Sequence, residues 1–256
     1  MVYTGKNPIT ESHGQEQYFL EVMMWINMCV CLPLTILIIY CVSYMVQKSQ
    51  ISIIYYTNLL ITNLIQICIM TLWVTRVESI ITIIIYYCVM MANLYFRMCI
   101  ALERYFSITH PLLDCLRNTK SSVVVCVLVW VFCIVSVPLA IVLNTFQHLI
   151  IYVIIPAPVF IFCLAQTFRA LPAISSMSTV EKQRSLGTLT LLFLNYVVII
   201  LPTIASYVLD NHNHISWILF LLIPLVDLFF FIFTVCVWCE NSTASDEEYD
   251  DECGLL

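Results

Sequence analysis

Residues 121–168 read SSVVVCVLVWVFCIVSVPLAIVLNTFQHLIIYVIIPAPVFIFCLAQTF and contain no Asp, Glu, Lys or Arg. The stretch is about 48 residues long, and a helix that crosses a bilayer needs about 20 apolar residues. It therefore predicts two membrane-spanning helices joined by a tight hairpin at Asn144-Thr-Phe-Gln-His148. Both spans should be helical, because lipid cannot satisfy the polar groups of an open backbone.

The rest of the chain has the same character. Hydrophobic residues make up 62% of it and charged residues only 10%, against about 25% charged in soluble domains. The sequence predicts an all-α, seven-transmembrane helix bundle in residues 21–239, preceded by an extracellular N-terminus (1–20) and followed by an acidic cytoplasmic tail (240–256). The predicted spans are 22–46, 52–75, 79–105, 121–143, 149–171, 185–209 and 215–238.

Basic residues predict the orientation, because cytoplasmic loops are enriched in Lys and Arg. With the N-terminus outside and the C-terminus cytoplasmic, the inner loops and helix ends receive Lys48, Arg104, Arg117, Lys120, Arg169, Lys182 and Arg184, and the outer side receives Lys6 and Arg76. The formal net charge of −6 comes largely from the acidic tail. The lipid bilayer is thus an expected partner, and nothing in the charge pattern indicates nucleic acid.

Cysteine and histidine are placed differently along the chain. None of the 13 cysteines falls in a predicted outer segment, so no extracellular disulfide is expected. No Cys/His spacing indicates a metal site, no cofactor is expected, and no nucleophile–base arrangement indicates an enzyme. Four histidines do fall in the predicted outer segments, and they are either candidate pH sensors or ordinary polar loop residues. They are His13, His148, His212 and His214.

One motif ends the third predicted span. Residues 101–112 contain Glu103-Arg104-Tyr105, followed by His110-Pro-Leu112. This resembles the third-helix signature of rhodopsin-like (class A) G-protein-coupled receptors. Further points of resemblance are Asn58-Leu-Leu-Ile-Thr-Asn-Leu64 in the second span, Trp130 and Pro138 in the fourth, Pro156 or Pro158 in the fifth and Pro202 in the sixth. The resemblance implies that Glu103, Arg104 and Tyr105 couple to a G protein, and that Pro156, Pro158, Pro202 and Pro224 kink their helices.

The resemblance is uneven. Asn63 stands where the family has an Asp that binds sodium, and Ile199-Ile200 replaces a Cys-Trp pair. Asp227-Leu-Phe-Phe-Phe231 stands in place of Asn/Asp-Pro-x-x-Tyr, and Ser79 in place of a disulfide cysteine. A closer resemblance, to fish orphan receptors grouped near the proton-sensing, lysolipid and nucleotide receptors, is carried by Ile100–Tyr105, Pro156–Phe162, Glu181–Arg184 and Leu201-Pro202.

Arg97 is the most unusual residue, because it lies inside a span. Its spacing from Asn93 and Arg104 places the three side chains on one helix face. A buried Arg in a membrane helix costs at least about 2.5–3.5 kcal/mol and is generally paired. Asp227 is the one acid deep in another predicted span, so we infer that Arg97 pairs with Asp227 and takes the place of a bound cation. Alternatively, Asn93, Asn63 and backbone carbonyls satisfy Arg97, which then only holds the bundle together.

These features favour a plasma-membrane receptor that transmits an extracellular stimulus to heterotrimeric G proteins, with protons, a lysolipid or a nucleotide as candidate ligands. The alternative is a seven-helix decoy or partner receptor that no longer signals. A transporter or channel is less favoured, since the sequence shows no internal repeats with paired broken helices. In the tail, Asp251, Leu255 and Leu256 resemble an acidic dileucine sorting signal, so arrestin or an endocytic adaptor is a candidate partner.

Overall fold

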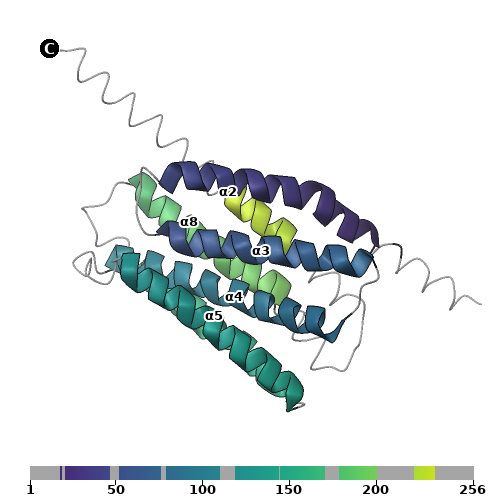
Figure 1. The fold of residues 1–256 in the computed structure, drawn as a ribbon. Coiled ribbons are helices and arrows are strands. Elements are labelled where there is room, and N and C mark those ends of the chain that lie inside the picture. Colours follow the sequence, from purple (N-terminus) through teal and green to yellow (C-terminus); the bar gives the residue numbers. More distant parts are fainter. Residues whose placement is uncertain are drawn as a thin grey trace, which may run out of the picture.

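The structure, a computed structural model, describes residues 18, 21–46, 52–75, 79–109, 119–143, 145–170, 179–200 and 222–233. Every regular element in these ranges is helical, as the sequence predicts, and the long helices run side by side in an elongated bundle (Figure 1). The elements are η1 (Asn27–Cys31), α2 (Leu32–Val46), α3 (Ser52–Val74), α4 (Ile80–Thr109), α5 (Thr119–Val142), α6 (Phe146–Ile154), α7 (Pro156–Ala170), α8 (Thr179–Asn195) and η4 (Tyr196–Ile200). A further segment, Leu222–Phe233, is called the last helix below.

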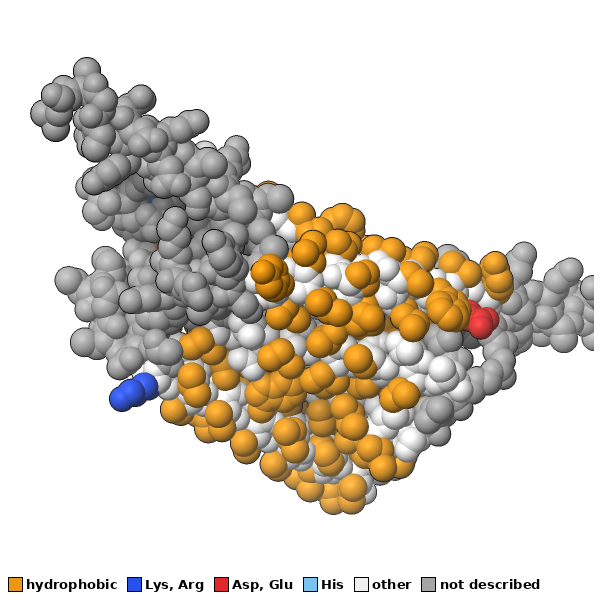
Figure 2. All heavy atoms as spheres, turned by 45° about the horizontal axis from the view of Figure 1, so that its top comes forward, with side chains coloured by type: hydrophobic (Ala, Val, Ile, Leu, Met, Phe, Trp, Pro, Cys, Tyr) orange, Lys and Arg blue, Asp and Glu red, His pale blue; other side chains and the backbone are white. Residues whose placement is uncertain are grey.

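Several helices have the length and composition of membrane spans. Within the described ranges, five helical segments are long and apolar enough to cross a bilayer, which identifies the chain as a membrane protein. They are Glu21–Tyr40, Ile54–Trp73, Ile80–Thr109, Lys120–Val142 and Leu149–Ala170, and two shorter apolar helices are Ser185–Val198 and Leu222–Phe233. Figure 2 shows one face of the molecule covered by apolar side chains, with charged side chains at its opposite ends.

Helix α4 is the centre of the bundle. It contacts α3, α5, α7 and α8, and all residues from 89 to 97 are buried. A helix that is buried on every side has neighbours on every side. A polar side chain in this part of α4 must therefore find its partner inside the protein. By contrast, α5 exposes a row of large apolar side chains, as expected of a helix that faces lipid.

The hairpin and the fifth predicted span differ from the prediction. The helix resumes at Phe146 after an irregular Thr145, so the connection is shorter than residues 144–148 and His148 belongs to the first turn of α6. The predicted span 149–171 corresponds to the helical segment Leu149–Ala170, in which the turn residue Ile155 separates α6 from α7. Helix α8 begins at Thr179, earlier than the predicted residue 185, because the polar residues before 185 continue the helix beyond its apolar part.

The division between α6 and α7 has a clear cause in Pro156. Proline has no N–H, so Pro156 cannot donate to the carbonyl four residues earlier, that of Tyr152. The hydroxyl of Tyr95 in α4 donates to this carbonyl instead, at 3.1 Å. The next carbonyl, of Val153, accepts from the hydroxyl of Tyr196 in η4, also at 3.1 Å. Two neighbouring elements are thus hydrogen-bonded to the broken helix.

The other predicted kink prolines differ from Pro156. Pro158 lies in the first turn of α7, two residues after Pro156, so the two prolines share one turn and the kink at Pro158 stays a prediction. Pro224 is buried in the first described turn of the last helix. Pro202 lies outside the described residues.

Candidate functional site: a buried polar core

The polar side chains of α3 point into the bundle. Thr62, Asn63 and Gln66 are each at most 2% exposed. Asn58 accepts a hydrogen bond from the indole Nε1 of Trp130 in α5 at 3.1 Å, and the amide of Gln66 contacts the hydroxyl of Tyr86 in α4 at 3.3 Å. These polar side chains of α3 therefore face α4 and α5.

Helix α4 contributes the basic group of the site. Arg97 is 3% exposed, and its Nε donates to Oδ1 of Asn93 at 2.8 Å. The two residues are four apart, the spacing at which side chains on one helix face meet. This contact holds the guanidinium of Arg97 in the middle of the helix, away from both ends of α4.

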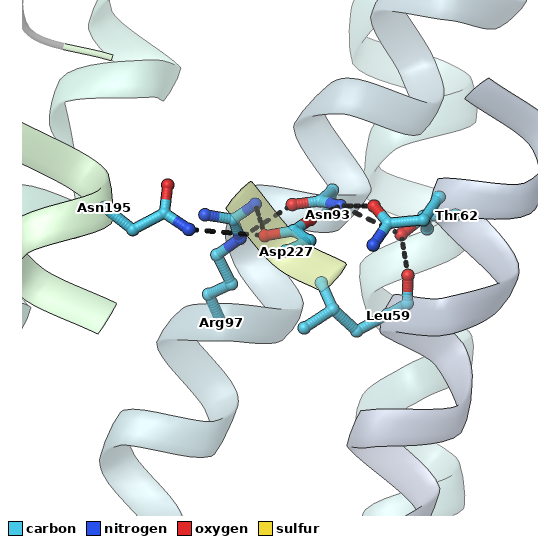
Figure 3. Close-up of polar contacts among 7 residues, drawn as sticks. Leu59, Thr62, Asn93, Arg97, Asn195 and Asp227 are labelled. Carbon is cyan, nitrogen blue, oxygen red and sulfur yellow. Dashed lines mark hydrogen bonds and ion pairs between the residues drawn. The ribbon is translucent and has the colours of Figure 1, made fainter. Parts of the chain in front are cut away.

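The last helix contributes the acid. Asp227 is 1% exposed, and its Oδ1 forms an ion pair with Nη2 of Arg97. Its carboxylate also lies 3.1 Å from the amide nitrogen of Asn93 and 3.3 Å from that of Asn195 in α8. Figure 3 shows these side chains converging on the carboxylate from separate helices. The structure thus contains the predicted pair, and it also contains the contact with Asn93 that the alternative requires.

Asn93 connects this pair to α3. Its amide nitrogen lies 2.6 Å from Oδ1 of Asn63, 3.1 Å from Asp227 and 3.3 Å from the hydroxyl of Thr62. An amide carries two N–H donors, so these three contacts cannot all be full hydrogen bonds. The contact with Thr62 is the longest, and the proton of that hydroxyl is donated to the carbonyl of Leu59 at 2.7 Å.

The arrangement joins four helices through a small group of polar residues, in which one positive and one negative charge cancel. We name Asn63, Asn93, Arg97, Asn195 and Asp227 the polar core. An isolated charge in a bilayer is costly, and a buried pair is tolerated only when further hydrogen bonds satisfy it. The polar core meets this condition with amides from α3, α4 and α8. The Arg97 guanidinium supplies the positive charge there, so the carboxylate has its counter-ion without a bound cation.

Asn195 is the member of the polar core that the sequence analysis missed. It is 7% exposed and lies in the run Leu191-Leu-Phe-Leu-Asn-Tyr196. A single amide among apolar residues at the depth of another buried charge was the available signal.

Glu103, Arg104 and Tyr105 lie in the last turns of α4 rather than at its end, because the helix continues to Thr109. All three side chains are half-buried. Arg104 is seven residues beyond Arg97, or about 10 Å along the helix axis at 1.5 Å per residue. The ring of Tyr105 contacts Phe162 of α7 edge to face, with centroids 5.5 Å apart. The triplet thus lies about two helical turns beyond the polar core, and its Tyr105 packs against α7.

The remaining predicted site residues are not brought to the polar core in the described part of the chain. His148 belongs to α6. His13, His212, His214, Asp251, Leu255 and Leu256 lie outside the described residues. Within the described ranges, no three His, Cys, Asp or Glu side chains are grouped as metal ligands would be.

Two comparisons of the chain with known proteins give no match. No protein-family model matches it, and a search of curated proteins finds no significant match.

Proposed function

We propose that this protein is a plasma-membrane receptor of the rhodopsin-like class, with seven spans, its N-terminus outside and its C-terminus cytoplasmic. In this proposal it transmits an extracellular stimulus to a heterotrimeric G protein. Five membrane-length apolar helices and two shorter ones support the bundle. The basic residues on the predicted inner side support the orientation.

The polar core is the observation that carries the proposal. Ionisable residues inside a membrane bundle are costly to bury and are therefore candidates for function. Here they join α3, α4, α8 and the last helix, so a change in the position of one helix alters the contacts of the others. The Glu103-Arg104-Tyr105 triplet lies on the same central helix, about 10 Å further along. A receptor needs such a link between an outer stimulus and an inner surface, because a ligand acts by shifting an equilibrium between helix arrangements.

The second candidate is a seven-helix protein that does not signal. The polar core itself favours this candidate in one respect. Asp227 is bound by Arg97, Asn93 and Asn195 from two other helices. If these contacts never separate, they fix the bundle in one arrangement. The departures from the receptor motifs at Ile199-Ile200 and Asp227-Leu-Phe-Phe-Phe231 point the same way.

The test is G-protein nucleotide exchange in cells expressing the parent chain, Arg104→Ala or Arg169→Ala. Arg169 is an exposed cation in the last turn of α7, so Arg169→Ala is the matched control for loss of one positive charge. Stimuli are a pH series, lipid extracts and nucleotides. We expect exchange in the parent and the control, and none in Arg104→Ala, at equal surface expression.

Three results would overturn the proposal or a part of it. Unchanged exchange in Arg104→Ala would remove Arg104 from coupling. Absence of exchange in the parent under every stimulus and with every G-protein class would favour the non-signalling candidate. An N-terminal tag that antibodies fail to reach on intact cells would refute the orientation.

A further inference from the structure

A groove lies between α8 with η4 on one side and the last helix on the other. Its volume is about 440 Å³, within the range of about 300–1,000 Å³ that ligand sites occupy. Its lining residues include Leu194, Asn195, Val198, Phe229 and Phe233. Leu194, Val198, Phe229 and Phe233 are each at least 49% exposed, so the groove opens on the outer surface of the bundle.

Asn195 is the one polar residue among these lining side chains. Its amide nitrogen contacts Asp227 at 3.3 Å. Its Oδ1 is buried and has no hydrogen-bond partner among the described residues, and Figure 3 shows this oxygen turned away from Asp227. A buried acceptor without a donor is unfavourable by about 1–3 kcal/mol, so the Asn195 amide beside the groove lacks one hydrogen-bond donor.

We propose that this groove binds a single-chain lipid that carries one hydroxyl group part of the way along its hydrocarbon chain. The apolar walls hold the chain, and the hydroxyl donates to Oδ1 of Asn195. The donor must be uncharged, because the surroundings are hydrocarbon and a further charge there is costly. The volume suits one chain rather than a two-chain lipid. The inference goes beyond the proposed function, since binding does not require a G protein.

The position of Asn195 sets the position of the hydroxyl. Asn195 contacts Asp227, and Asp227 pairs with Arg97. Arg97 lies twelve residues before the end of α4 at Thr109, or about 18 Å along the helix axis. A lipid whose head group stays at the membrane surface therefore reaches Asn195 only with a distant part of its chain. The contact of the Asn195 amide with Asp227 is long and the terminal torsion of an asparagine is soft. Binding would turn Oδ1 toward the groove, and the hydrogen bond from the lipid hydroxyl would offset the weakened contact with Asp227.

The probes are 12-hydroxyoctadecanoic acid and octadecanoic acid, which differ in that one hydroxyl. The full-length protein is placed in dioleoylphosphatidylcholine nanodiscs, and its thermal midpoint is measured as each acid is added. We expect a saturable rise with the hydroxylated acid and a clearly smaller one with octadecanoic acid. Equal rises, or no rise with either, would overturn the proposal, and the latter would assign Oδ1 of Asn195 to water.

Two phenylalanine variants test the location. Phe229→Trp enlarges a lining residue that is 64% exposed and should reduce the rise by narrowing the groove. Phe168→Trp makes the same change at an α7 residue that is 53% exposed and outside the groove, and it should leave the rise intact. Equal behaviour of the two variants would refute the location. Asn195→Leu should remove the difference between the two acids, and a persisting difference would exclude Asn195 as the acceptor.

Discussion

The guanidinium of Arg97 is enclosed by the bundle, so its interactions must come from neighbouring side chains. Asn93 contacts it from the same helix and Asp227 from the last helix. Removing one partner of a buried ion pair commonly costs about 3–5 kcal/mol, because the other charge is left uncompensated. The two residues should therefore depend strongly on each other.

A double-mutant cycle measures this dependence. We expect Arg97→Leu or Asp227→Asn alone to lower the free energy of unfolding by about 3–5 kcal/mol. The two changes together should cost less than the sum of the single costs, because contacting residues are not additive. The measurement is thermal or denaturant unfolding in detergent, with Arg169→Leu as a control that should change little. Strict additivity would show that the two charges do not stabilise each other.

At the scale of the helices, the division between α6 and α7 depends on two tyrosines from other elements. Tyr95 and Tyr196 donate to the carbonyls of Tyr152 and Val153. Tyr196 directly follows Asn195 in the chain, so adjacent residues contact the broken helix and the polar core. The position of α7 is thereby tied to the position of α8.

Removing the hydroxyl of Tyr95 or of Tyr196 should weaken the connection of α7 to its neighbouring helices. We expect Tyr95→Phe and Tyr196→Phe each to reduce stability by about 1–3 kcal/mol, since each leaves a carbonyl without its donor. Thermal unfolding measures the effect. Tyr40→Phe is the control, because Tyr40 is 71% exposed on α2, and it should have almost no effect. If Tyr95→Phe is equally harmless, the Tyr152 carbonyl has another donor.

The helices and the ion pair were predictable from sequence for physical reasons. Long apolar segments have few alternatives to helix in a bilayer, and a buried Arg needs an acid, of which the predicted spans offered Asp227. Pro156 and Pro158 were both predicted to kink the fifth span, and the sequence alone does not place a turn residue at Ile155, immediately before Pro156. Asn195 was missed because one amide is too weak a signal in a hydropathy pattern. The contacts of Tyr95 and Tyr196 depend on helix positions that no local pattern encodes.

At the scale of the whole molecule, the described part of the fold is held together by packing and hydrogen bonds without a disulfide. The cysteines whose side chains the structure describes are free thiols within helices: Cys29, Cys31, Cys68, Cys88, Cys99, Cys126, Cys133 and Cys163. Cys133 and Cys163 are completely buried, where they act as small apolar side chains. Covalent cross-links are not needed to explain how these helices stay together.

The thermal midpoint in detergent should therefore be nearly the same with and without a reducing agent. The oxidised form of the same reagent serves as the control for effects of the compound itself. A clear loss of stability on reduction would mean that cysteines outside the described residues form a disulfide that supports the fold.

The ion pair also sets an order of events during synthesis. Arg97 and Asp227 are 130 residues apart in the chain. At about 5–20 residues per second, the ribosome makes Asp227 roughly 6–26 s after Arg97. During that interval α4 enters the membrane with its charge unmatched by an acid, and Asn93 is the contact that its own helix provides. A chain that ends before the last helix therefore keeps the Arg97 charge without its acid.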